Sequence, residues 1–326
     1  MKILLIFLTF LVSIHGQAQF FRKDKGLAHT FSIVARDPVT GEIAVGVQSH
    51  WFSVGTAVSW GEGGVGVVAT QSFVNKSYGL KGLALMKAGK TAAEALQQLL
   101  KEDEGREVRQ VAMLDSKGNV SAHTGKNCID FAEHITGTNF SVQSNMMLTN
   151  KVCTAMAKSF EGSSGKPLAE RVMLCLHAAQ VAGGDIRGKQ SAALLVVKGT
   201  SEGKPWDERL IDLRVDDSND PLKELARLLT VYRAYDHMNN GDLFVEKGDM
   251  KQAMNEYSAA MKMFPQNLEM KYWTAITLAN NKKISEAAVM LQKIYTKDPH
   301  WRELTKRLPK AGLLSVSEPE LSLLLK

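Results

Sequence analysis

Three short segments near the start of the chain carry apolar residues at successive positions, and this pattern constrains the fold most. They are FSIVARD (31–37), EIAVGVQS (42–49) and GVGVVATQSF (64–73). Successive side chains of a strand point to opposite faces of a sheet, so strands of this kind are buried on both faces. The sheets that they form must therefore be covered on each side by another layer.

The segments that follow supply these layers. Two helices are predicted over 79–89 and 91–103, with Thr91 as N-cap and Glu94 as its capping-box partner. Two more are predicted over 150–162 and 167–184. The remaining strands are expected at 107–115, 120–125, 139–148, 191–199 and 208–217. This grouping predicts an α+β fold over residues 30–220, a four-layer αββα sandwich of two packed sheets between two helical layers.

The N-terminus has the pattern of a secretory signal peptide. Lys2 precedes the apolar run ILLIFLTFLVSI, and the small residues Gly16 and Ala18 follow it. We expect cleavage after Ala18, a short pro-segment over 19–29, and a mature protein exported to the periplasm or the cell exterior. The run is short for a membrane span, so no stable membrane anchor is expected; an uncleaved anchor is the alternative.

The region after residue 220 loses the strand pattern and shows a 34-residue period, with repeats at 234–267 and 268–301. Small, aromatic and proline positions of one repeat recur in the next: Ala253, Tyr257, Ala260 and Pro265 align with Ala287, Leu291, Ile294 and Pro299. This arrangement resembles the tetratricopeptide repeat. We therefore predict an all-α domain over 221–310, followed by a C-terminal tail (311–326). Since two repeats are too few to stand alone, they should dock on the first domain or on the bridging helix.

Composition excludes several classes of function. The formal charge is +6, but basic and acidic residues alternate without a dense basic run, so nucleic acid is not an expected partner. No metal or cofactor is expected, because the metalloprotease, phosphate-loop and dinucleotide motifs are absent. The three cysteines (Cys128, Cys153 and Cys175) lack metal-binding spacing. Their odd number leaves at least one free thiol, and the sequence does not decide whether any disulfide forms.

Polar residues interrupt the apolar pattern in three places. Thr30 stands at the head of the first strand. Amide and hydroxyl side chains gather at strand ends in ATQSFVN (69–75) and SVQSN (141–145). A glycine-rich connection at 182–191 carries Asp185, Arg187 and Gln190.

Five motifs resemble a bacterial family catalogued as domain of unknown function 1028 and regarded as N-terminal-nucleophile (Ntn) hydrolases. They are TFSIVARDPVTGEIAVGVQS, GGVGVVATQSFVN, YGLKGLALMKAG, GGDIRGKQSAALLVV and DLRVDD, in order from Thr30 to about Pro221. The resemblance implies the αββα fold and hydrolysis of an amide bond in a small-molecule or peptide substrate. It names no particular substrate.

The implied mechanism assigns roles to residues of this sequence. Thr30 would be the nucleophile, with its own α-amine as base. Gln71 and Asn145 are candidates for the oxyanion hole. Asp185, Arg187 and Gln190 would line the site, with Arg187 holding a substrate carboxylate. In relatives that begin Met-Thr-Phe-Ser, removal of Met exposes the Thr; here signal cleavage leaves eleven residues ahead of Thr30. Either the bond between His29 and Thr30 is cut, or Thr30 has no free amine.

Other interpretations stay open for these residues. Thr30 is also an ordinary β-favouring residue, Ser32 is a weaker nucleophile candidate, and the loop residues can form a self-satisfied polar network. His50 is more often structural than functional. The charges of Asp212, Arg214 and Asp216 are interpreted as a solvated ladder on one strand face.

The alternative to an enzyme is a non-catalytic ligand- or protein-binding module whose repeats recruit a protein partner. The sequence does not settle the oligomeric state, although proteins with several strand edges and apolar helices often assemble into homo-oligomers.

Overall fold

The computed structural model describes residues 27–28 and 30–326, and the part up to Val215 contains two antiparallel β-sheets. In the five-stranded sheet the strands lie in the order β1 (Leu27–Ala28), β5 (Gly66–Phe73), β6 (Arg109–Asp115) and β7 (Val120–Thr124), and β4 (Ser59–Glu62) also pairs with β5. The six-stranded sheet has the order β11 (Arg209–Val215), β10 (Ser191–Val197), β3 (Ile43–Ser49), β2 (Thr30–Arg36), β9 (Phe140–Ser144) and β8 (Glu133–Gly137).

The two sheets pack face to face over an apolar core. Val34 and Val45 of the six-stranded sheet belong to the same buried cluster as Val67 and Leu114 of the five-stranded sheet. Alternate residues of β2, such as Phe31 and Ile33, point the other way, into a second core. The central strands are therefore buried on both faces, as their apolar pattern predicts.

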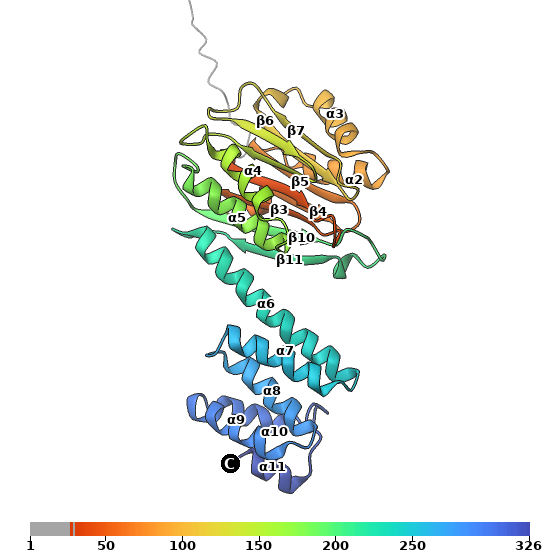
Figure 1. The fold of residues 1–326 in the computed structure, drawn as a ribbon, viewed down its shortest axis with the longest axis vertical. Helices are drawn as coiled ribbons and strands as arrows, with labels where there is room; N and C mark the ends of the chain where they lie inside the picture. Colours follow the sequence, from red (N-terminus) through yellow and green to blue (C-terminus); the bar gives the residue numbers. More distant parts are fainter. Residues whose placement is uncertain (1–26, 29) are drawn as a thin grey trace, which may run out of the picture.

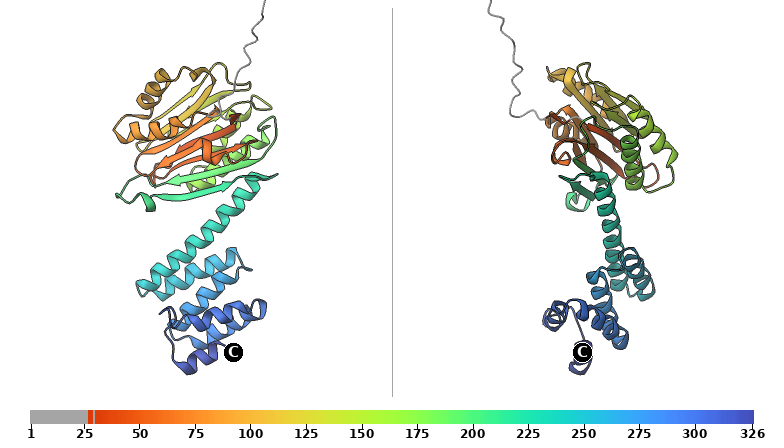
Figure 2. Two further views of the ribbon diagram at one scale, coloured as in Figure 1. Left: turned by 180° about the vertical axis from the view of Figure 1, so that it is seen from behind. Right: turned by 90° about the vertical axis from the view of Figure 1, so that its left-hand side faces the viewer.

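Helices cover the outer faces of the two sheets (Figures 1 and 2). The helices α2 (Ser77–Lys87) and α3 (Ala92–Glu102) share a core with β5 and β6. On the other side, α4 (Val152–Gly162) and α5 (Leu168–Val181) pack on β2 and β9. The predicted mixed α/β class is confirmed, and the capping box of Thr91 and Glu94 is present at the start of α3.

Several short elements have no counterpart in the sequence prediction. They are β1, β4, β8, the one-turn helix α1 (Gly55–Val58) and the 3-10 turns Arg106–Val108 and Pro205–Asp207. β4 and β8 are partly exposed and carry glycine, charged and aromatic residues rather than an alternating pattern. Their sheet partners, not their own sequence, determine their conformation.

The long helix α6 (Pro221–Glu246) connects the sheets to the C-terminal helices, as Figure 1 shows. Leu222, Leu225 and Leu229 in its first half belong to the core under the six-stranded sheet. Ala234 and Met238 in its second half belong to the core that it shares with α7 (Met250–Met263). Because one continuous helix contributes to both cores, it bridges the two regions.

The C-terminal helices repeat in pairs. α7 and α9 (Ile284–Lys297) are offset by 34 residues at both ends, and α8 (Leu268–Asn280) has the same offset from the second half of α6. Gly241 lies against the Tyr257 ring, where an added Cβ would approach the ring to 2.4 Å. Three of the four aligned pairs are buried in both repeats, namely Ala253, Tyr257, Ala260, Ala287, Leu291 and Ile294, whereas Pro265 and Pro299 are exposed.

The chain ends in two further helices, α10 (His300–Arg307) and α11 (Glu318–Leu324). Leu314 and Leu324 are buried in the core formed with α8 and α9. The segment 311–326, predicted as a tail, is therefore a packed part of the helical region. The predicted signal peptide and most of the predicted pro-segment lie outside the described residues. Within the described part of the chain, no helix combines the length and apolar character needed to span a membrane.

Candidate functional site

Thr30 begins β2 at a point where the chain changes sheets. Leu27 and Ala28 of β1 pair with β5 in the five-stranded sheet, whereas Thr30 pairs with Ser49 of β3 in the six-stranded sheet. Thr30 lies on the same face of β2 as Val34, so its side chain faces the space between the sheets. Thr30 is fully buried in this form of the chain.

Two of the predicted site residues hold the main chain of Thr30. Its carbonyl oxygen accepts hydrogen bonds from the backbone N–H of Asn145 at 3.1 Å and from Nε2 of Gln71 at 3.2 Å. The Asn145 side chain also donates to it, at 3.5 Å. The structure therefore brings Thr30, Gln71 and Asn145 together, although the first two come from different sheets.

Gln110 of β6 is the centre of this network and was not predicted. Its Oε1 accepts from Nε2 of Gln71 at 2.7 Å and from Nδ2 of Asn145 at 2.9 Å. Its own amide donates to the Ser144 carbonyl and to Thr124 Oγ1, both at 2.9 Å, and to the Glu133 carbonyl at 3.2 Å. The available signal was a glutamine directly before the apolar run VAML of a strand, because such a side chain needs buried partners.

The polar layer continues along β2 and β9. Gln143 donates through Nε2 to Ser32 Oγ at 2.6 Å, and the Ser32 hydroxyl donates to Gln71 Oε1 at 2.7 Å. Ser32, the weaker nucleophile candidate, thus already has both a donor and an acceptor partner. These residues are fully buried, so each hydrogen bond between the sheets compensates for the loss of hydration.

Asp185 and Arg187 form a second group on the loop after α5. The Arg187 guanidinium donates to both oxygens of Asp185, at 3.0 and 2.7 Å, and the backbone N–H of His50 donates to the same carboxylate at 3.2 Å. Asp185 is buried, whereas the Arg187 side chain is 28% exposed. Asp185 therefore orients the guanidinium and leaves part of it accessible to solvent.

The two groups lie at the same end of the six-stranded sheet. The backbone N–H of Gln190 donates to the carbonyl of Ser49, the strand partner of Thr30, at 3.1 Å. Met147, two residues after Asn145, forms a β-bridge with Asp185. The Gln190 side chain itself turns to Asp217, at 3.2 Å, so only the main chain of Gln190 faces this network.

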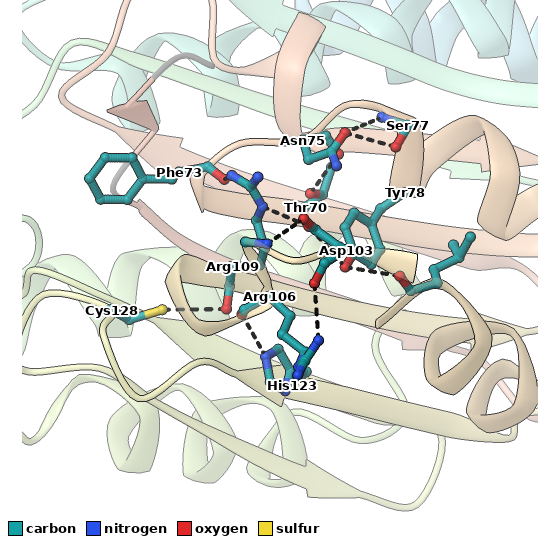
Figure 3. Close-up of polar contacts among 12 residues, drawn as sticks. Thr70, Phe73, Asn75, Ser77, Tyr78, Asp103, Arg106, Arg109, His123 and Cys128 are labelled. Atoms are coloured by element: carbon teal, nitrogen blue, oxygen red, sulfur yellow. Dashed lines mark hydrogen bonds and ion pairs between the residues drawn. The ribbon is translucent and has the colours of Figure 1, made fainter. Parts of the chain in front are cut away.

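A buried cluster around Arg109 stabilises the neighbouring end of β5 (Figure 3). Arg109 donates through Nε to Asp103 Oδ2 at 2.9 Å and through a terminal nitrogen to the Phe73 carbonyl. Burial opposes ionisation of Asp103, but the hydrogen bond and charge of Arg109 lower its pKa overall. Tyr78 also donates to Asp103, and its pKa is raised by burial and by that carboxylate. Since Phe73 pairs with Leu27, this cluster secures the strand on which β1 lies.

His134 connects the network to a titratable group. Its Nδ1 lies 2.8 Å from Thr124 Oγ1, the hydroxyl that accepts from Gln110. Burial first, and the charge of His123 second, lower the pKa of His134. At a given pH, a larger fraction of this imidazole is therefore neutral than of a solvated histidine.

The remaining residues considered as candidates are the charged residues of β11 and the three cysteines. Asp212 pairs with Arg214 at 2.9 Å and with Arg209 at 2.7 Å on the edge strand β11. All three cysteines are buried free thiols, and burial raises their pKa values. Within the described residues, no group of three or more His, Cys, Asp or Glu side chains is arranged to hold a metal ion.

Comparisons with known proteins agree with the motifs. The model of a family of unknown function, DUF1028, matches residues 30–225. A crystal structure of a DUF1028 protein from Silicibacter pomeroyi is similar, with 30% sequence identity and a TM-score of 0.56, over 62% of this chain and 85% of that one. A search of curated proteins found no match. Because the family model matches more than half of its length, the chain belongs to the DUF1028 family.

Proposed function

We propose that this protein is an exported amide hydrolase of the Ntn class, with Thr30 as nucleophile and the α-amine of Thr30 as base. The observation that carries the proposal is the position of Thr30: it begins β2 where the chain changes sheets, and an amide network holds its carbonyl oxygen. The family match also begins at this residue. The layered sheets and helices are compatible with an Ntn-hydrolase fold.

The chemistry follows from a free amine beside a hydroxyl. An α-amine has a pKa of about 7.7–8.0, so a useful fraction is neutral near pH 7. It takes the proton from Thr30 Oγ as that oxygen attacks the substrate carbonyl. The tetrahedral intermediate collapses, the leaving amine takes the proton, and an acyl ester remains on Thr30. Water then hydrolyses the ester with the same amine as base.

The network suggests roles for the other predicted residues. Gln71 and Asn145 already donate within it, so we assign them first to positioning the Thr30 main chain. To serve in an oxyanion hole, Gln71 or Asn145 would have to give up one of these hydrogen bonds and donate to the substrate oxygen instead. Arg187, held by Asp185 and partly exposed, is suited to bind a substrate carboxylate.

Processing is an essential part of the proposal. Thr30 is fully buried while Ala28 is paired with β5, so the uncut chain offers neither an amine nor an accessible hydroxyl. Cleavage before Thr30 would supply the amine and release β1 from the site. The uncut protein should therefore be inactive.

The test compares two forms of the chain against a panel of amide substrates. One form begins at Thr30 after removal of an initiator Met, and the other begins at Gln19 and is kept uncut. We expect hydrolysis by the first form alone, and a loss of at least about 10³-fold on Thr30→Ala. Thr30→Ser should retain part of the activity, and Thr296→Ala, on the exposed face of α9, should retain all of it. Equal activity of the uncut form, or of Thr30→Ala, would contradict the mechanism.

The burial of Thr30 also supports a second candidate, a non-catalytic binding module. In that case the helix pairs, which repeat every 34 residues like tetratricopeptide repeats, would recruit a protein partner. This candidate predicts that Thr30→Ala leaves the biological role intact and that changes on the repeat helices abolish it.

A further inference from the structure

A second polar cavity lies at the opposite end of β2 from Thr30. It has a volume of about 600 Å³ and lies between the β2–β3 turn, the α4–α5 loop, α5 and α6. Thr30 and Arg36 are the first and last residues of the seven-residue strand β2, so about 20 Å separates this cavity from the proposed nucleophile. It is therefore a separate site.

Cations dominate the lining of this cavity. Arg36, Lys166, Arg171 and Arg233 contribute positive charges, against the carboxylates of Asp37 and Glu42. One further carboxylate, Glu170, adjoins the site and pairs with Arg233 at 3.0 Å. Burial is the main cause that raises the pKa of Glu42, and the charge of Arg233 opposes it. Four cations therefore face three carboxylates, and Arg36 and Lys166 are in no ion pair among the described residues.

Arg171 is the most constrained of these cations. It is 8% exposed, and its guanidinium lies over the Phe160 ring, 3.9 Å from the ring centre. One terminal nitrogen donates to the Phe160 carbonyl at 3.1 Å, and the nearest carboxylate oxygen, on Asp37, is 4.0 Å away. A guanidinium has five N–H donors, so this environment leaves it short of acceptors.

Two buried donors without partners among the described residues also indicate that acceptors are lacking at this cavity. Within the described chain, the buried Nε atoms of both Arg36 and Arg171 have no hydrogen-bond partner. Burial lowers the pKa of Arg171 because its charge is poorly compensated. A buried cation of this kind is costly unless an acceptor completes its surroundings.

The start of α5 lies beside the same cavity. The helix begins at Leu168, and Pro167 before it supplies no side-chain cap. The N–H groups of the first turn have no intrahelical acceptor, and the helix dipole makes this end favourable for negative charge. Lys166 and Pro167, which precede the helix, line the cavity.

We propose that this cavity binds an oxyanion, the phosphate or carboxylate group of a small molecule. Arg36, Arg171 and Lys166 supply the charge, and the N-terminal end of α5, which begins after Pro167, adds the favourable end of a helix dipole.

The test is calorimetric titration of the mature protein with inorganic phosphate and, separately, with citrate. We expect saturable binding of one or both anions, and a Kd raised at least about tenfold by Arg36→Gln and by Lys166→Gln. Lys158→Gln, on the exposed surface of α4 and outside the cavity, should leave the Kd unchanged. Circular dichroism of each variant checks the fold.

The two anions distinguish ligands that carry phosphate from ligands that carry carboxylate. Binding of phosphate alone assigns the site to phosphate-bearing ligands, and binding of citrate alone assigns it to carboxylates. Absence of saturable binding of either anion, or an equal loss of binding in Lys158→Gln, would overturn the proposal. Neither result depends on whether Thr30 is a nucleophile.

Discussion

Two buried glutamines test whether the network of hydrogen bonds around Thr30 stabilises the fold. Gln110 and Gln48 are both fully buried on central strands. Gln110 accepts two hydrogen bonds and shares its two N–H groups among three acceptors, whereas neither polar side-chain atom of Gln48 has a partner among the described residues. The same substitution, Gln→Leu, therefore removes a satisfied amide at one position and an unsatisfied amide at the other.

The two substitutions should have opposite effects on the free energy of unfolding. Gln110→Leu deprives the amides of Gln71 and Asn145 of their shared acceptor and removes the side-chain donor of the Ser144 carbonyl. Each buried polar group left unsatisfied costs about 1–3 kcal/mol, so the total should be about 4 kcal/mol. Gln48→Leu removes an uncompensated amide beside Phe31 and Ala192, and should be neutral or stabilising by up to about 2 kcal/mol.

Guanidinium denaturation of both variants and the unsubstituted protein measures these changes. Gln97→Leu, on the exposed face of α3, controls for the added apolar surface and should stay within about 0.5 kcal/mol. If Gln48→Leu destabilised the protein as much as Gln110→Leu, hydrogen bonding would not explain the difference between the two sites. A change below about 1 kcal/mol for Gln110→Leu would also refute the reasoning.

Two further predictions concern packing and pH. Gly241→Ala should destabilise the helical region by about 2 kcal/mol, because its Cβ would lie 2.4 Å from the Tyr257 ring. The control Gly162→Ala should be neutral or slightly stabilising, because an added Cβ meets nothing within 4 Å there; thermal unfolding of both variants measures the difference. Because burial and His123 lower the pKa of His134, the unfolded chain binds more protons than the folded one as pH falls below about 6.5, so the free energy of unfolding should decrease there. His134→Gln should reduce this dependence between about pH 7 and about pH 5, and an unchanged slope in denaturation midpoints would contradict the assignment.

Much of the fold could be predicted from the sequence because its signals are local. Continuous apolar runs predicted β2, β3 and β5, and their double-sided burial required helical layers. The 34-residue period predicted the buried positions of the helical repeats, since the same contacts recur in each pair. β8 was missed because it is a half-buried edge strand stabilised by β9, and its own residues, EHITG, carry little strand pattern.

The candidate site was predictable only in part. The position of Thr30 at the head of a strand and the gathering of amides at strand ends were visible in the sequence. That Gln71 from one sheet would bond to Thr30 of the other depends on how the sheets stack, which no local pattern encodes. Gln110 and Arg109 were missed for the same reason, because their partners are distant in the chain.

The identity of the first residue in the native exported protein tests the central claim most directly. Intact-mass analysis with N-terminal sequencing measures it, and sequencing after Thr30→Ala serves as a control for cleavage by another protease. If Thr30 is the nucleophile, the mature chain begins at Thr30 and carries a free α-amine there. A native, exported form in which Thr30 remains joined to His29 would contradict it.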